Sequence, residues 1–151
     1  MGLLYMMAVP NFIAMSVRAK RAGVIHNMHT TQTAAELAGV DGGGTFPVGV
    51  DDQLKSYFPH GGNDGTTPAP EGSINPFTNI PEFPILGNIS DVDAARNAAP
   101  ADVLAEGAVE YSGIMDDPDS GVADQYAIRG AAAGGKIISN SSSTTLVLSC
   151  Q

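Results

Sequence analysis

Residues 1–23, MGLLYMMAVPNFIAMSVRAKRAG, decide the fold of this 151-residue chain. Most of the first 17 side chains are apolar, Pro10 interrupts the run, and the cations Arg18, Lys20 and Arg21 follow it. A helix needs about 20 apolar residues to span a membrane, so this run is too short for a span. It is also too apolar for an ordinary soluble amino terminus. We therefore expect a helix that buries its apolar surface against something outside the rest of the chain.

The helical pattern continues past the basic cluster to about residue 38. Apolar side chains recur at spacings of four and seven residues and draw one stripe along a helix: Ile13, Val17, Val24, Met28 and Ala35. A helix of this extent is roughly 54 Å long, far longer than a domain of this size needs. We expect Pro10, which lacks a backbone N–H, to kink or locally open the helix. We expect Gly39 to end it.

Residues 39–87 are rich in Gly, Pro, Asn and Asp and predict a long loop after the helix. A short helical piece is expected near residues 51–57, and another within the Ala-rich residues 91–106. Five aromatic side chains are spread through the loop, and we expect them to hold it against a core: Phe46, Tyr57, Phe58, Phe77 and Phe83.

The carboxy-terminal part predicts a small antiparallel sheet. Residues 107–114 (GAVEYSGI) alternate apolar and polar side chains and lead into a turn, DDPDSG. Residues 125–130 (QYAIRG) are expected to be the antiparallel partner, and residues 136–139 and 145–149 to be further short strands.

The order of these elements predicts an α+β fold. A long amino-terminal helix would pack on a small antiparallel β-sheet, with a Gly/Pro-rich loop between the two. We divide the chain into an assembly helix, residues 1–38, and an α+β head, residues 39–151. The head comprises the loop region, residues 39–87, and the sheet, residues 107–149.

The charge is unevenly distributed along the chain. The net charge is −9, but residues 1–35 carry three cations and no acid. The acidic remainder would repel a phosphate backbone, so we expect no nucleic-acid partner. The basic cluster directly follows the apolar run, where cations would meet the headgroups at a membrane surface.

Residues 2–29, GLLYMMAVPNFIAMSVRAKRAGVIHNMH, resemble the amino-terminal helix of type IV pilins and type II secretion pseudopilins. Gly2, the Pro-x-Phe at Pro10–Phe12 and the basic turn after it match that pattern. NPFT at residues 75–78 is similar to the Asn-Pro-aromatic-Thr loop of major pseudopilins. The strands with Gly-x-x-x-Tyr (from Gly107) and Tyr-x-Ile-x-Gly (from Tyr126) are similar to the sheet of that family.

The beginning of the sequence departs from the family pattern. Family members start with a basic leader, a cleavage site and a longer apolar segment that carries a Glu near the mature amino terminus. None of these features is present before Pro10, and Met1 falls where the middle of that segment would be. The resemblance therefore implies that the leader and the first part of the apolar segment precede Met1.

The resemblance implies a non-enzymatic structural subunit that polymerises through its amino-terminal helix into a type IV pilus-like filament. The expected partners are identical subunits, the inner membrane before assembly, and pilus or secretion assembly machinery. The expected location is the bacterial cell envelope, first as a membrane-anchored precursor and then as an extracellular or periplasmic filament. In keeping with a non-enzymatic role, the sequence has no GxSxG motif and no Walker A motif.

Two alternatives remain open. The first is a major pseudopilin of a type II secretion system that forms a periplasmic pseudopilus, which the NPFT motif and the acidic turn favour. The Ser/Thr-rich tail and the Gly-rich loop instead favour a surface pilus. The second alternative belongs to another class: a membrane-tethered module that captures a ligand through its Gly/Pro-rich loop and stays monomeric.

Each expected site is assigned to particular residues. The filament-assembly surface comprises Gly2, Leu3, Leu4, Val9, Pro10, Phe12, Ile13, Val17 and Val24. The membrane-proximal basic group comprises Arg18, Lys20 and Arg21. Clustered carboxylates are the ligands that calcium prefers, so the candidate calcium ligands are Asp116, Asp117, Asp119 and Asp124; an ordinary acidic turn is the alternative. The candidate glycosylation sites are Asn88, Asn140, Ser141, Ser142 and Ser143.

The sequence contains a single cysteine, Cys150, next to the last residue. One cysteine cannot close an intrachain disulfide. We expect a free thiol there, with a crosslink to a second chain as the alternative.

Overall fold

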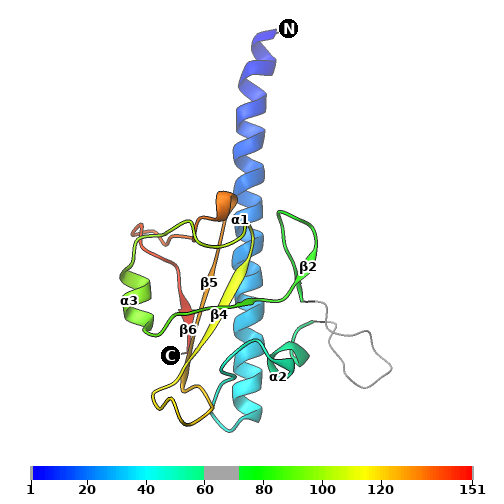
Figure 1. Cartoon of the computed structure of the whole chain (residues 1–151). Coiled ribbons are helices and arrows are strands. Elements are labelled where there is room, and N and C mark those ends of the chain that lie inside the picture. Colours follow the sequence, from blue (N-terminus) through cyan, green and yellow to red (C-terminus); the bar gives the residue numbers. More distant parts are fainter. Residues whose placement is uncertain (1, 60–71, 151) are drawn as a thin grey trace, which may run out of the picture.

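The computed structural model describes the backbone of residues 2–59 and 72–150, and the side chains of residues 12–59 and 72–150. Helix α1 (Gly2–Asp41) is one continuous helix that projects well beyond the rest of the molecule at its amino-terminal end (Figure 1). The expected local opening of the helix at Pro10 is wrong, because α1 continues through that residue without a break.

The predicted helix end at Gly39 is also wrong, and packing explains why. A Cβ atom at Gly39 would lie 2.6 Å from Cε1 of Phe46, so this glycine allows the Phe46 ring to rest on the helix. The helix ends instead at Asp41, where the amide of Gly42 still donates to Ala38 and that of Gly44 to Gly39. The positive φ angles of Gly43 and Gly44 turn the chain away.

The main sheet has four strands in the order β3-β4-β5-β6, and it packs along the carboxy-terminal half of α1 (Figure 1). The strands β4 and β5, and likewise β5 and β6, pair antiparallel, whereas β3 pairs with β4 in parallel. A separate antiparallel pair, β1-β2, lies in the loop region. The strands are β1 (Ser73–Ile74), β2 (Pro81–Glu82), β3 (Ile85–Leu86), β4 (Val109–Ile114), β5 (Gln125–Gly130) and β6 (Leu148–Ser149).

The α+β prediction is confirmed: a long amino-terminal helix packs against a mostly antiparallel sheet in a pilin-like arrangement. The two expected carboxy-terminal strands are largely wrong. Residues 136–139 make isolated bridges, Ala131 with Ile137 and Ser139 with Thr145, and β6 occupies two residues of the expected five. Gly134 and Gly135, both with positive φ, turn the chain just before this segment, so regular pairing with β5 does not develop.

The core lies between α1 and the sheet. Tyr111, Tyr126 and Ile128 point from the strands toward the helix, where Val24 and Met28 are fully buried. The hydroxyl of Tyr111 donates to the carbonyl of Pro47 over 2.7 Å, which ties the loop after α1 to β4. The opposite face of the sheet carries a smaller apolar cluster, Ile89, Ile114, Ala127 and Val147, partly covered by α3 (Val92–Asn97).

Aromatic side chains hold the loop region on this core, as the sequence predicts. The ring of Phe58 is buried and packs edge-on against Phe83, with the centroids 5.6 Å apart. Phe46 packs edge-on against Tyr126 at 4.9 Å. The short helix α2 (Asp52–Ser56) also forms where it was expected, because the Asp51 carboxylate accepts the amide of Leu54 and caps its amino terminus.

The close approach of α1 to β5 gives a first testable prediction, Gly130→Ala. A Cβ at Gly130 would lie 2.8 Å from Val24 Cγ1 and 2.9 Å from Met28 Sδ, both fully buried. We expect the free energy of unfolding to fall by about 1–3 kcal/mol through overpacking, measured by urea denaturation. Gly49→Ala is the matched control, since its nearest neighbour is Leu86 Cδ1 at 3.4 Å. Equal stability of the two variants would contradict the packing described here.

The buried tyrosines predict how stability depends on alkaline pH. Burial raises the pKa of Tyr111 and Tyr126 above the usual range, and the hydrogen bond from Tyr126 to Glu36 adds to the effect. Below the unfolded-state pKa of about 10 both states hold these protons, so stability is unaffected. At higher pH the unfolded chain loses protons that the folded chain keeps, and stability falls by at most about 1.4 kcal/mol per pH unit for each tyrosine.

Thermal melts between neutral pH and about pH 11 test this prediction. We expect a flat melting temperature up to the phenol range and a steep fall above it, and a shallower fall in Tyr126→Phe. A melting temperature that stays level through the phenol range would contradict the burial of these hydroxyl groups.

Candidate assembly surface

Part of α1 extends beyond the head (Figure 1), and its described side chains, from residue 12 onward, include exposed apolar ones. Here the head means the sheet with the helices and loops packed around the carboxy-terminal half of α1. The exposed fractions are 75% for Phe12, 57% for Ile13, 65% for Met15 and 38% for Val17. Three of the predicted assembly residues, Phe12, Ile13 and Val17, therefore lie on one solvent-exposed stretch. Five others belong to α1 but have side chains outside the described residues: Gly2, Leu3, Leu4, Val9 and Pro10.

Val24 was assigned to the assembly surface, and that assignment is wrong. Its side chain is fully buried against the sheet and helps to form the core of the head. The position continues the apolar stripe of α1, but at Val24 the sheet covers the stripe. The boundary between the exposed and the buried part of α1 therefore lies between Val17 and Val24.

A hollow of about 300 Å³ lies where α1 leaves the head. Phe12, Ile13 and Val17 line it from the helix, and Phe77 lines it from the NPFT turn. Lys20 and Glu106 supply charged groups to its wall. We call this hollow the exit groove; it joins the exposed helix surface to the head, and its lining is partly apolar and partly polar.

Two of the three cations in the predicted basic group contact the head itself. The guanidinium of Arg21 donates to the carbonyl of Ser139 over 2.6 Å, and Lys20 Nζ lies 5.1 Å from the centroid of the Phe77 ring. Arg18 is exposed on the helix. The basic residues thus form a collar around α1 at the level of the exit groove.

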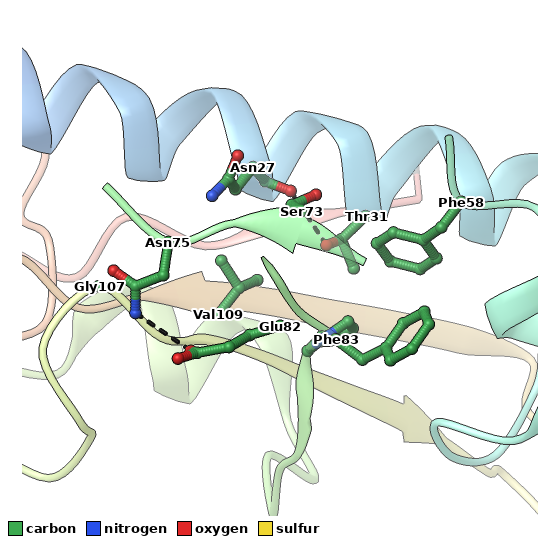
Figure 2. Close-up of a pocket in the computed structure, with 10 residues that line it drawn as sticks. Asn27, Thr31, Phe58, Ser73, Asn75, Glu82, Phe83, Gly107 and Val109 are labelled. Carbon is green, nitrogen blue, oxygen red and sulfur yellow. Dashed lines mark hydrogen bonds between the residues drawn. The ribbon is translucent and has the colours of Figure 1, made fainter. Parts of the chain in front are cut away.

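The NPFT motif forms a tight turn, and the side chain of its first residue, Asn75, makes the hydrogen bonds that hold it (Figure 2). This side chain is 3% exposed and makes four hydrogen bonds. Its Oδ1 accepts the amides of Phe77 and Thr78, and its Nδ2 donates to Glu82 Oε2 and to the carbonyl of Glu106. Asn75 therefore links the β1-β2 hairpin to the segment that leads into β4.

Contacts with α1 fix this turn beside the exit groove. The side chain of Asn27 donates to the carbonyl of Ile74 over 2.8 Å. The missing side chain of Gly23 allows Pro76 to approach, since a Cβ there would lie 2.7 Å from Pro76 Cγ. Sequence reasoning missed both residues; their spacing of four along the helix was the available signal.

The cavity under the NPFT turn is too small for a ligand. Its volume is about 10 Å³, and its lining includes Asn27, Thr31, Glu82 and Val109 (Figure 2). Sites for small molecules usually occupy about 300–1,000 Å³. The hydrogen bonds of this turn connect β2, the segment before β4, and α1.

A buried ion pair on the other face of the sheet was also missed. Glu110, 2% exposed, faces Arg129 on the neighbouring strand, with Arg129 Nε 2.8 Å from Glu110 Oε2 and Nη2 3.1 Å from Oε1. The amide of Asn88 also donates to this carboxylate. The alternation of residues 107–114 indicated a polar face for Glu110, but the segment after β3 covers that face.

The predicted calcium ligands do not form a metal site in the part of the chain that the structure describes, where no cluster of three or more candidate ligand residues occurs. Two of the four carboxylates instead accept backbone amides: Asp124 from Asp116 and Asp117 from Asp119. All four residues are exposed. The acidic β4–β5 loop is held by its own turn hydrogen bonds, as the alternative of an ordinary acidic turn expects.

The glycosylation candidates lie on the surface, but Asn140 is engaged. Its side chain accepts the amides of Ser142 and Thr144 and donates to the Thr144 hydroxyl, so its amide closes the turn. Ser141, Ser142, Ser143 and Asn88 are exposed. The thiol of Cys150 is free and its residue is half-buried.

Within the described residues, no helix combines the length and the apolar character that a membrane span requires. Comparison of the chain with protein families, with curated proteins and with solved structures gives no match.

Proposed function

We propose that this protein is the structural subunit of a helical filament of the type IV pilus kind, and that it polymerises through the exposed half of α1. The observation that carries the proposal is the apolar surface of Phe12, Ile13, Met15 and Val17 on a helix that extends beyond its own head. The sequence resemblance of this same helix to type IV pilins gives the proposal its family.

The energetics of an exposed apolar helix support polymerisation. Full burial of an aliphatic or aromatic side chain is worth about 1.5–3 kcal/mol, so the three most exposed of these residues represent a substantial unused driving force. A helical segment that packs on nothing is also marginal in water. Contacts with the helices of other copies would remove both penalties at once.

Repetition of one such contact produces a fibre. A contact between two different surfaces of the chain leaves one surface of each kind unused, one on each copy, so further copies can add, and open helical polymers result when the rotation does not close. The exposed helix meets this requirement, because it lies at one end of the molecule and the carboxy-terminal end of α1 lies at the other (Figure 1).

Before assembly, the same apolar surface would rest in a membrane. The proposed precursor is anchored in the inner membrane of a bacterial cell envelope, with Arg18 at the level of the headgroups. Assembly machinery of a pilus or secretion system would then transfer it into an extracellular or periplasmic filament. The role is structural and non-enzymatic.

A second candidate within the family is the major pseudopilin of a type II secretion system. The observation in its favour is the NPFT turn, whose Asn75 makes four hydrogen bonds and joins three segments. The membrane-tethered binding module is the other alternative, and a shallow hollow of about 450 Å³ between α1 and residues 72–76 is the observation in its favour. A strictly monomeric protein would favour that module.

Substitution of Ile13 tests the assembly surface. We expect Ile13→Lys to reduce the polymerised fraction of the full chain at least tenfold, because a lost aliphatic contact of 1.5–3 kcal/mol corresponds to about tenfold or more in an association constant. Pelleting by ultracentrifugation and negative-stain microscopy measure the polymer. Val103→Lys is the matched control, since Val103 is 58% exposed on the head and Ile13 is 57% exposed on the helix.

The control variant should polymerise like the unmodified protein, and both variants should keep its melting temperature. Equal polymerisation of the two lysine variants would contradict the proposal that the exposed half of α1 is the assembly surface.

A further inference from the structure

The two ends of the molecule differ in charge: one carries a cluster of cations and the other a cluster of carboxylates. The basic collar of Arg18, Lys20 and Arg21 lies on α1 next to the exit groove, and Lys20 lines the groove itself. The opposite end, which we call the far end, contains the turn after α1 and the β4–β5 loop, joined by a bridge between Phe46 and Ala123 (Figure 1). Five exposed carboxylates lie there: Asp41, Asp116, Asp117, Asp119 and Asp124.

The far end also carries exposed apolar side chains. Val40 is 76% exposed and Leu37 46% exposed on the last turns of α1, and Val122 is 38% exposed in the acidic loop. The far end thus presents an apolar group edged by carboxylates, and the exit groove presents an apolar hollow edged by cations. The two surfaces match both in apolar character and in charge.

We propose that the exit groove of one copy binds the far end of the next copy. This inference rests on the proposed filament function and identifies the partner surface of the same site. Leu37 and Val40 of one copy fill the groove beside Val17 of the other, and the acidic loop faces Arg18 and Lys20. Opposite charges at the rim of such a contact set its orientation and register.

The geometry of α1 permits this arrangement by simple translation. Val17 and Val40 lie 23 positions apart on one helix, so a shift of roughly 35 Å along the helix axis, combined with a sideways displacement of about 8–10 Å between the two helix axes, brings one beside the other. The shifted copy lies alongside the exposed half of α1 and covers it. In each bound pair one copy keeps an unused far end and the other an unused groove, so the contact is heterologous and can propagate.

Two charged residues have the opposite sign to the surface considered: Glu106 at the exit groove and Lys55 on α2. Glu106 lines the exit groove, where it accepts the amide of Gly134. Lys55 lies on α2 and is 3.9 Å from Asp52. Lys20 and Glu106 both line the groove, so the positive charge of this end comes from Arg18 and Arg21 beside it on α1, whereas five exposed carboxylates occupy the far end.

A charge-swap experiment tests the pairing. The first variant, R18E/K20E, makes the collar acidic, and the second, D116K/D119K, makes the far end basic. Asp117 and Asp124 stay in place because their carboxylates hold the loop. Each full-length variant alone presents like charges at the contact, whereas a mixture offers opposite charges at both kinds of junction.

Sedimentation velocity at low salt measures self-association of the unmodified chain, of each variant and of the equimolar mixture. We expect at least tenfold weaker association for each variant alone, recovery in the mixture, and a loss of association of the unmodified chain at high salt, where screening is strong. Melting temperatures verify that the variants are folded. R18E paired with D119K provides a milder version if a double variant is unstable.

The outcomes separate this inference from the filament proposal. Variants that associate like the unmodified chain, a mixture that stays dissociated, or an unmodified chain that is monomeric at both salt concentrations would overturn the pairing. Filaments that survive both substitutions would overturn it and leave the filament function intact. Charge-dependent recovery in closed, non-fibrous oligomers would support the pairing and contradict the filament function.

Discussion

Arg129→Ala is expected to lower the free energy of unfolding by about 3–5 kcal/mol, the usual cost of removing one partner of a buried ion pair. The substitution leaves the Glu110 carboxylate, 2% exposed, without the guanidinium that now makes two hydrogen bonds to it. The amide of Asn88 remains as a donor but carries no charge. Urea denaturation followed by circular dichroism gives the change.

Two comparisons isolate the buried charge as the cause. Asp52→Asn removes a carboxylate from the exposed pair with Lys55, and we expect a change of no more than about 0.5 kcal/mol. The double substitution Glu110→Met with Arg129→Met removes both charges, and we expect it to be more stable than Arg129→Ala alone. A cost below about 1 kcal/mol for Arg129→Ala would show that Glu110 is hydrated, contrary to the structure.

Asn75→Ala is expected to cost about 3 kcal/mol, since the residue makes four hydrogen bonds, each worth roughly 0.5–1.5 kcal/mol net, in a buried position. Its loss removes the hydrogen bonds that tie the NPFT turn to the Glu82 side chain and to the carbonyl of Glu106. The exit groove should lose its Phe77 wall as the turn loosens. Urea denaturation measures the stability, and hydrogen exchange of the Phe77 amide measures the turn.

Substitution of Gly107 tests the packing around Asn75 from the segment that leads into β4. A Cβ there would lie 2.0 Å from Asn75 Oδ1, and φ is +80°. Gly134, with φ +72° and no atom within 4 Å of its Cβ position, is the matched control for backbone strain alone. Gly107→Ala should therefore be clearly less stable than Gly134→Ala. Equal losses would mean that strain, and not the contact with Asn75, limits residue 107.

The sequence predicted those elements whose pattern is local. The long helix, the exact span of β5 and the approximate place of the short helix α2 were all predicted. The parallel strand β3 could not be predicted, because two residues in a Pro-rich loop carry no periodicity and pair with a strand more than twenty positions away. Gly39 was misread as a helix end because the contact that requires glycine there comes from Phe46.

The candidate site divides in the same way. The exposed apolar residues Phe12, Ile13 and Val17 were predictable, since apolar side chains on too long a helix need an external partner. The burial of Val24 depends on where the sheet begins, which the stripe itself does not reveal. Calcium was predicted at the acidic loop because clustered carboxylates resemble a set of calcium ligands. In the structure, the carboxylates of Asp117 and Asp124 accept backbone amides within the turn, which the sequence does not reveal.

The central claim is that the exposed half of α1 forms the interior of a filament. Helical reconstruction from electron micrographs of fibres assembled from the full-length gene product tests it most directly. We predict ordered fibres in which Phe12, Ile13 and Val17 of each copy lie inside, against neighbouring copies, with the sheets outside. Fibres with these side chains facing solvent, or a folded protein that remains monomeric at every concentration, would contradict it.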